Sequence, residues 1–134
     1  MRPIKVFLDS DVIISSLLSS AGAAYLLVNK KSVDKYISNL SVKEIKIVAK
    51  RLGIKSPAVN KLINHIKIVR LKKVSGKNYV TDVNDSHIIA GAVTAKVRFL
   101  LSYNLKHFKI EKIKRDFNIL VYRPAQFLQY LRSL

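Results

Sequence analysis

Residues 4–13 carry the sequence Ile-Lys-Val-Phe-Leu-Asp-Ser-Asp-Val-Ile, and this stretch decides the fold. Its first half is short, apolar and rich in β-branched and aromatic residues, which predicts a buried strand over residues 4–8. After the acidic pair Asp9 and Asp11, apolar residues recur at helical spacing, which predicts a helix over residues 12–19. The two acids therefore lie where a central strand leads into a helix. In open α/β sheets, ligands bind at this carboxyl end of the strands.

The rest of the chain alternates predicted strands with predicted helices. Short apolar runs predict strands over residues 35–38, 66–71, 98–102 and 118–122. Helical spacing predicts helices over residues 23–29, 41–52, 84–97 and 124–131, and from Pro57 onward. Residues 105–117 form a basic connector with helical character. This alternation predicts a single domain over residues 1–134, with helices on both faces of a central, mainly parallel sheet.

Composition limits the class of protein. The chain has 134 residues, of which 49% are hydrophobic, so it can bury a core of its own. It has no cysteine, which excludes disulfide bonds and thiolate metal sites. No apolar run approaches the roughly 18 residues of a membrane span, and the first residues leave no room for a signal peptide. We therefore expect a cytoplasmic protein that does not enter a membrane.

The net charge indicates a polyanionic partner. The chain has 25 lysines and arginines against eight acidic residues, a formal net charge of +17. Thirteen of the basic residues lie between Lys30 and Lys73, where Asp34 and Glu44 are the only acids. A basic surface can serve solubility alone, but this imbalance exceeds what solubility needs. We therefore expect nucleic acid, bound through its phosphates.

Five of the eight acidic residues fall at predicted strand ends or helix starts: Asp9, Asp11, Glu44, Asp82 and Asp85. Because parallel strands all end at one edge of a sheet, these side chains are expected to lie near one another. Such a group of carboxylates repels itself unless a cation lies among them. The available ligands are oxygen atoms, and the sequence has neither a cysteine nor the histidine spacing of a zinc site. These features favour Mg²⁺ or Mn²⁺ over Zn²⁺.

Each acid also has a structural explanation when it is taken alone. Asp9 or Asp11 would cap the helix that follows the first strand. Glu44 completes the pattern Ser-x-x-Glu with Ser41, which predicts a capping box at the start of its helix. Asp85 near a helix start interacts favourably with the helix dipole. These explanations do not account for the gathering at one edge, which favours a functional site.

Five motifs, in order, resemble those of PIN-domain ribonucleases such as the VapC-like toxins. Residues 7–13 are similar to the family's opening acidic motif, and residues 41–44 (Ser-Val-Lys-Glu) to its second acidic position. Residues 82–92 resemble the third acid with its small-residue helix, and residues 99–108 the motif hydrophobic-Ser-x-Asn-x-x-x-Phe. Residues 124–128 (Pro-Ala-Gln-Phe-Leu) resemble the closing motif. The resemblance covers nearly the whole chain and implies a three-layer α/β/α PIN-like fold.

The resemblance also implies an activity, that of a metal-dependent endoribonuclease. The catalytic positions that it implies are Asp9, Glu44, Asp85 and Asn104, and the first three would hold Mg²⁺ or Mn²⁺. The residues implied to orient ligands or waters are Asp11, Ser102 and Asp82. A metal-bound water loses its proton more easily and attacks a phosphodiester in line, without a covalent enzyme intermediate.

The chain departs from the family's motifs at two positions. Asp11 stands where many members carry Asn, and Asn104 stands where many carry a fourth Asp. Asp11 keeps an oxygen ligand and adds a negative charge. Asn104 keeps a carbonyl oxygen and removes a negative charge, which predicts weaker metal binding at a second site.

Three functions are compatible with these residues. The leading hypothesis is an RNA-cleaving enzyme, as in toxin–antitoxin pairs, with an antitoxin as partner, or in RNA processing. The alternative is a basic nucleic-acid-binding module with weak or no nuclease activity, motivated by Asn104 and the charge. A phospho-accepting receiver domain would need an Asp at the end of the third strand, which the sequence lacks. Cleavage of mixed RNA with Mn²⁺, Mg²⁺ or a chelator separates the first two.

The first and last helices indicate self-association. Together they carry more apolar residues than one small sheet is expected to cover: Leu17, Leu18, Leu26, Leu27, Phe127, Leu128, Tyr130, Leu131 and Leu134. The resemblance also implies a homodimer, which would place two acidic sites and two basic flanks along one RNA. The alternative is that these residues complete the monomer's own core.

Overall fold

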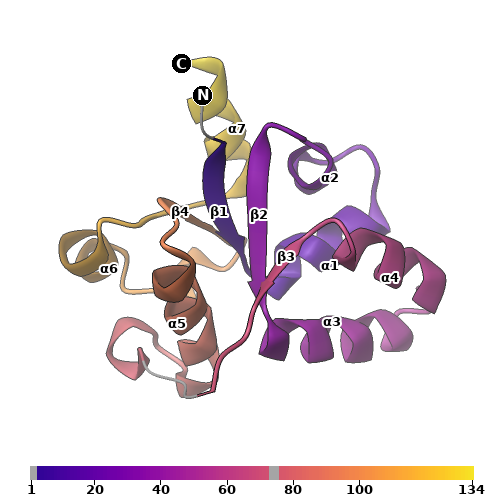
Figure 1. Cartoon of the computed structure of the whole chain (residues 1–134), viewed down its shortest axis with the longest axis horizontal. Coiled ribbons are helices and arrows are strands. Elements are labelled where there is room, and N and C mark those ends of the chain that lie inside the picture. The colour runs from indigo at the N-terminus through magenta and orange to yellow at the C-terminus, as the bar shows by residue number, and fades with distance from the viewer. Residues whose placement is uncertain (1–2, 73–75) are drawn as a thin grey trace.

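The computed structural model describes residues 3–72 and 76–134, which fold around a five-stranded sheet (Figure 1). The strand order is β3 (Lys67–Val69), β2 (Val33–Ser38), β1 (Ile4–Leu8), β4 (Phe99–Leu101) and β5 (Leu120–Tyr122). All neighbouring strands run parallel, so every strand ends at the same edge of the sheet. The first apolar run of the sequence forms the central strand, and Asp9 therefore follows it at the middle of that edge.

Helices cover both faces of the sheet. One face packs against α1 (Ser10–Leu18), α2 (Ala23–Val28), α3 (Asn39–Arg51), α4 (Ser56–Ile63) and α7 (Pro124–Arg132). The other face packs against α5 (Ser86–Ala95) and α6 (Ile110–Phe117). Single 3₁₀ turns lie between these elements: η1 (Lys77–Tyr79), η2 (Val83–Asp85) and η3 (Leu105–His107). The predicted α/β/α fold with a parallel sheet is confirmed.

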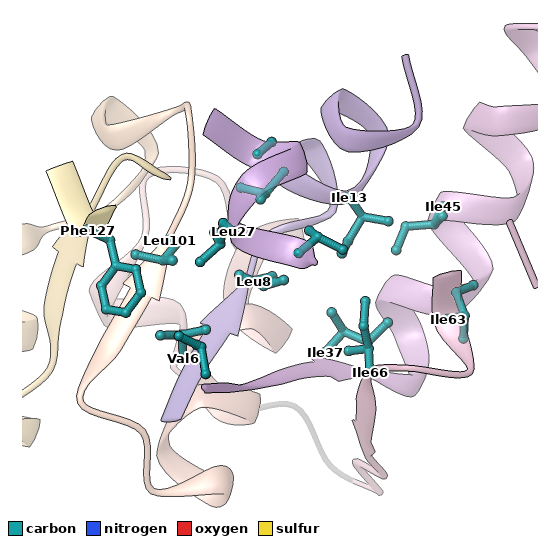
Figure 2. Close-up of a cluster of buried hydrophobic side chains, with 14 of the residues drawn as sticks. Val6, Leu8, Ile13, Leu27, Ile37, Ile45, Ile63, Ile66, Leu101 and Phe127 are labelled. Carbon is teal, nitrogen blue, oxygen red and sulfur yellow. The ribbon is translucent and has the colours of Figure 1, made fainter. Parts of the chain in front are cut away.

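Alternating side chains of β1 enter two separate cores. Val6 and Leu8 point into the larger core, where they pack with side chains such as Ile13 and Leu27 (Figure 2). Phe7 points into the core on the opposite face, under α5 and α6. All of these side chains are fully buried, and burying one of this size contributes about 1.5–3 kcal/mol. The two cores fix β1, and with it Asp9, between two layers of helices.

α5 lies close against β1 because Gly91 has no side chain at their contact. A Cβ atom on Gly91 would lie 2.6 Å from Cε2 of Phe7, well inside van der Waals distance, and closer still to Cζ. The predicted small-residue helix over residues 84–97 thus exists, but α5 is shorter, and η2 precedes it. The close packing holds the end of η2, which carries Asp85, at the carboxyl edge of the sheet.

The start of α3 differs from the sequence prediction. The N-cap is Ser38, whose hydroxyl oxygen accepts a hydrogen bond from the backbone N–H of Ser41 at 3.0 Å. The predicted capping box of Ser41 and Glu44 is therefore wrong, and Glu44 lies in the second turn of the helix. The reason is that Ser38 ends β2 in an extended conformation and caps a helix that already begins at Asn39, so Ser41 lies inside the helix and not at its N-cap.

The structure gives exact bounds to two further segments, of which the first has the predicted helical character and the second is shorter than predicted. The basic connector over residues 105–117 contains η3 and a true helix, α6, whose Ile113 is buried beneath the sheet. The strand predicted over residues 66–71 is limited to β3 at the edge of the sheet. Among the described residues, no helix is long and apolar enough to cross a membrane.

Candidate active site

A cavity of about 470 Å³ opens at the carboxyl edge of the sheet. Its polar lining comes from four separate parts of the chain: the end of β1 with the start of α1, the second turn of α3, the end of η2 and the loop after β4. The acidic and amide residues that line it are Asp9, Asp11, Glu44, Asp85 and Asn104. All the catalytic positions predicted from the sequence therefore share this cavity.

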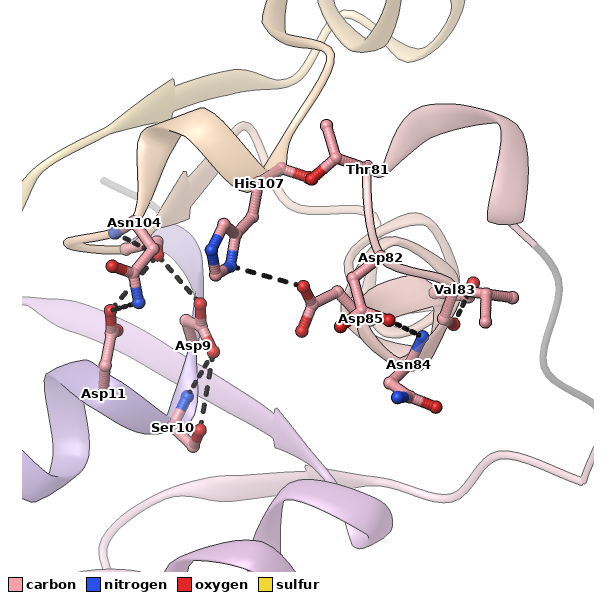
Figure 3. Close-up of polar contacts among 12 residues, drawn as sticks. Asp9, Ser10, Asp11, Thr81, Asp82, Val83, Asn84, Asp85, Asn104 and His107 are labelled. Atoms are coloured by element: carbon pink, nitrogen blue, oxygen red, sulfur yellow. Dashed lines mark hydrogen bonds and ion pairs between the residues drawn. The ribbon is translucent and has the colours of Figure 1, made fainter.

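Asp9 is the most deeply buried of these acids. It caps α1, and its side chain is held at both oxygens: Oδ1 accepts from the backbone N–H of Ser10 and Oδ2 from the hydroxyl of Ser102, both at 2.8 Å (Figure 3). Burial and the neighbouring charge of Asp11 raise the pKa of Asp9 to about 7, although the two hydrogen bonds act in the opposite direction. Asp85 raises the pKa a little further. Among the residues that the structure describes, no positive charge forms an ion pair with this carboxylate.

Asp11 follows two residues after Asp9, in the first turn of α1, and also lines the cavity. Its Oδ2 accepts from the backbone N–H of Tyr103 at 3.0 Å and from the side-chain amide of Asn104 at 3.2 Å (Figure 3). Burial raises the pKa of Asp11, and the charge of Glu44 adds to the rise. Hydrogen bonds from the backbone of Tyr103, the hydroxyl of Ser102 and the backbone of Val12 oppose it. Its Oδ1 is buried and has no hydrogen-bond partner among the described residues.

The loop after β4 holds both aspartates. Ser102 is fully buried, and its hydroxyl lies 2.8 Å from Asp9 Oδ2 and 3.4 Å from Asp11 Oδ2. The same oxygen accepts a hydrogen bond from the backbone N–H of Asn104 at 3.0 Å. Ser102 therefore bridges the two carboxylates, and its role in orienting ligands or waters stays a prediction.

Asp85 faces His107 on the far side of the cavity. Asp85 Oδ2 lies 3.4 Å from His107 Nδ1, in a half-exposed pair (Figure 3). Burial raises the pKa of Asp85, and the charge of His107 opposes the rise. This pairing could not be predicted from the sequence, because the turn that carries His107 has no regular spacing to Asp85.

Glu44 lines the cavity from α3, and His87 lies in the first turn of α5. His87 Nδ1 is 3.2 Å from the hydroxyl oxygen of Ser38, the residue that caps α3. Burial lowers the pKa of His87, although the charges of Glu44 and Asp85 act in the opposite direction. A neutral His87 thus ties the start of α3 to α5, which keeps Glu44 and Asp85 on facing walls.

Asp82 is the predicted site residue that lies apart from the others. Its Oδ1 accepts from the backbone N–H of Asn84 at 3.0 Å and so caps η2, and its side chain is exposed. It does not line the cavity, although its charge raises the pKa of Asp85. Its position is that of a helix cap next to the site.

The described geometry agrees with a comparison against protein families. The family model described as PIN domain matches residues 5–106, which include every residue of the cavity named above except His107. The chain belongs to the PIN domain family. No curated protein sequence matches it.

Solved structures share the fold of this PIN domain at low sequence identity. A toxin–antitoxin complex from Klebsiella pneumoniae is similar with a TM-score of 0.64 and 19% identity, over 89% of this chain and 97% of that chain. VapBC2 from Rickettsia felis, bound to a DNA fragment from their promoter, has a TM-score of 0.62 and 14% identity, over 88% and 97%. PAE2754 from Pyrobaculum aerophilum has a TM-score of 0.62 and 12% identity, over 98% and 91%. Identities this low show a common fold.

The donor atoms of this PIN domain fit a hard divalent cation. Carboxylate and amide oxygens are the ligands that Mg²⁺ and Mn²⁺ prefer. The buried Oδ1 of Asp11 lacks a partner within the described part of the chain, and the pKa of Asp9 is raised to about 7, so both groups would gain from a nearby positive charge. Within residues 3–72 and 76–134, no three Asp, Glu or His side chains are already close enough to form a metal site.

Proposed function

We propose that this PIN domain is a metal-dependent endoribonuclease that hydrolyses phosphodiester bonds in RNA. One observation carries the proposal: Asp9, Glu44 and Asp85, from three distant parts of the chain, line a single cavity. These carboxylates lie in a protein of net charge +17, and a purely structural role does not require them to face one another.

The contacts of the site residues suggest a role for each of them. Asp9, Glu44 and Asp85 would hold Mg²⁺ or Mn²⁺. The bound ion would supply an acidified water as nucleophile and would neutralise charge on the phosphoryl oxygens. Ser102 orients Asp9 through its hydroxyl, and Asn104 supports Ser102 through its backbone N–H. His107 holds Asp85 toward the cavity.

The proposed substrate is RNA because of the basic surface. Thirteen lysines and arginines lie between Lys30 and Lys73, and most of them are exposed around α3 and α4. Lys35 is the buried one among those that the structure describes: it is 8% exposed, and its ammonium group donates to the carbonyl oxygens of Val28 and Lys30, both at 2.8 Å. Lys35 therefore supports the end of α2, and the exposed basic residues would bind phosphates.

We also propose a cytoplasmic role as the toxin of a toxin–antitoxin pair, with an antitoxin as protein partner. The support for this role is the similar fold of the toxin–antitoxin complex from Klebsiella pneumoniae. A gene for a small DNA-binding protein next to this gene would favour the role. A solitary gene whose product is tolerated at high expression would contradict it.

Cleavage of mixed RNA by the purified protein tests the nuclease. We expect cleavage with Mn²⁺ or Mg²⁺, none with EDTA, and none from Asp9→Asn combined with Asp85→Asn. Glu111→Gln removes one negative charge on the exposed face of α6 and is the matched control, which should cleave normally. Calorimetry should also show that the double variant loses the heat of Mn²⁺ binding. Cleavage that persists in EDTA or in the double variant would reject the site.

A second candidate function is a basic RNA-binding module with weak or no nuclease activity. The observation that favours it is the side chain of Asn104, which is an amide bonded to Asp11 where a further carboxylate would stand. RNA binding by the wild-type protein without cleavage, at saturating Mn²⁺, would support this alternative.

A further inference from the structure

The hydrogen bonds around Asp11 are distributed unequally between its two oxygens. Three donors converge on Oδ2: the backbone N–H of Tyr103, the side-chain amide of Asn104 and, at 3.4 Å, the hydroxyl of Ser102. None of the described residues donates to Oδ1, although this atom is buried. Asp9 differs, because each of its oxygens accepts a hydrogen bond at 2.8 Å. Asp11 thus differs from Asp9 in having a buried oxygen with no hydrogen-bond partner among the described residues.

Asn104 contacts Asp11 through its nitrogen and so acts as a donor. A carboxylate at position 104 has no proton to donate at neutral pH and would face Asp11 across the 3.2 Å that now separates the two side chains. The amide at position 104 and the carboxylate at position 11 therefore form a matched pair. Exchanging the two side chains would keep one carboxylate, one amide and one hydrogen bond between them.

We propose that Asp11 is the fourth carboxylate ligand of the cation site and that Asn104 is its positioning residue. This inference rests on the proposed cation site and changes the role of both residues: Asp11 contacts the cation through Oδ1, and Asn104 acts through Asp11. Ser102 bridges Asp11 to Asp9, so the two carboxylates are held side by side. The same loop after β4 thus sets the position of both.

Six proteins test the pair by Mn²⁺ titration at constant pH: wild type, Asp11→Asn, Asn104→Asp, the double exchange, Asn104→Ala and the control Glu111→Gln. Asp11→Asn should lower the Mn²⁺ affinity by about tenfold or more, and Asn104→Ala by about tenfold, as for a residue that orients a ligand. The double exchange should bind Mn²⁺ within roughly threefold of wild type, because the carboxylate and the hydrogen bond are both restored. Glu111→Gln, which removes a distant charge, should bind like wild type.

Thermal unfolding of the metal-free proteins supplies an independent measurement. Asn104→Asp should lower the melting temperature without metal, because two carboxylates then face each other, and Mn²⁺ should recover the loss. The double exchange should melt near wild type. Wild-type Mn²⁺ affinity in Asp11→Asn, or strictly additive losses in the double exchange, would overturn the proposal.

RNA cleavage by the same proteins separates this inference from the proposed function. If none of the proteins cleaves RNA but the Mn²⁺ affinities follow the expected cycle, the nuclease proposal fails and the roles of Asp11 and Asn104 hold. If wild type cleaves RNA and Asp11→Asn binds Mn²⁺ normally, the nuclease holds and the assignment of Asp11 fails.

Discussion

The buried carboxylate of Asp9 links the stability of the metal-free protein to pH. Its pKa is about 7 in the folded protein and near 4 in an unfolded chain. Between these values the folded protein retains a proton that the unfolded chain releases, so the free energy of unfolding falls as the pH rises and stays low above about 7. At pH 8 the penalty is on the order of a few kcal/mol.

Asp9→Asn removes this titration. In the presence of a chelator, urea unfolding of the variant should depend less on pH between about 5 and 8 than unfolding of wild type. Wild type with saturating Mn²⁺ should likewise gain more stability at the higher pH, where the carboxylate is charged. Parallel pH profiles for wild type and the variant would show that Asp9 is not the group responsible.

Because Ser38 caps α3, a substitution of Glu44 does not remove a helix cap, and its effect on cleavage can be read separately from its effect on stability. Glu44 is exposed in the second turn, so Glu44→Gln should change the free energy of unfolding by no more than about 0.5 kcal/mol. If Glu44 holds the cation, the same variant should lose RNA cleavage. The measurements are urea unfolding and a cleavage assay, with Glu111→Gln as control. A stable and fully active Glu44→Gln protein would reject the catalytic role.

Individual site residues were predictable to different degrees. Asp9, Asp11 and Asp85 could be found because each stands beside an element that hydrophobic periodicity reveals. The pairing of Asp85 with His107 could not be found, since it depends on the path of an irregular loop. The donor role of Asn104 was also hidden, because an amide can donate or accept and only its neighbour decides which.

At the scale of elements, periodicity predicted the strands and helices that are buried most deeply. β1, β4 and α5 are apolar on several sides and are bounded by polar residues, so their patterns are unambiguous. The start of α3 was misplaced because Ser38 and Ser41 are both good N-caps, and only the end of β2 selects between them. The apolar periodicity of α6 was hard to detect, because the helix is rich in lysine and Ile113 is its one fully buried residue.

The contact between α5 and β1 predicts a specific sensitivity at Gly91. Alanine normally stabilises a helix interior, yet Gly91→Ala should lower the free energy of unfolding by about 1–3 kcal/mol, because the added Cβ overlaps the ring of Phe7. Thr94→Ala, at an exposed position of the same helix, is the matched control and should cost nothing. Urea unfolding measures both, and an equally stable Gly91→Ala protein would contradict the packing described here.

For the whole molecule, the charge of +17 predicts how RNA affinity responds to salt. If binding is through phosphates, the logarithm of affinity should fall linearly with the logarithm of salt concentration, by about 0.7 for each phosphate contact with a single strand. Fluorescence anisotropy with a labelled RNA, repeated at several salt concentrations, measures the slope. A flat response would mean that the basic surface serves another purpose.

Self-association is also a property of the whole molecule. Part of the apolar surface on the first and last helices completes the monomer's core, since Leu27 and Phe127 are fully buried. Leu18, Leu26 and Leu134 remain exposed by 59%, 54% and 75%, and we predict that they contribute to a homodimer. Light scattering should give twice 15.2 kDa, and Leu26→Glu should return the mass toward the monomer. A mass near 15.2 kDa for wild type across a concentration series would defeat the prediction.

The pairing of β1 with β4 also determines when the site becomes complete during synthesis. Val6 of β1 pairs with Phe99 of β4. The central strand therefore cannot form its pairing with β4 until most of the chain has been synthesised. A nascent chain that ends before Ser102 already contains Asp9, Glu44 and Asp85, yet it lacks the hydroxyl that holds Asp9 and the loop that holds Asp11. The acidic residues are therefore synthesised before the residues that position them. An interrupted or truncated product contains the acids but not the contacts that hold Asp9 and Asp11 in place.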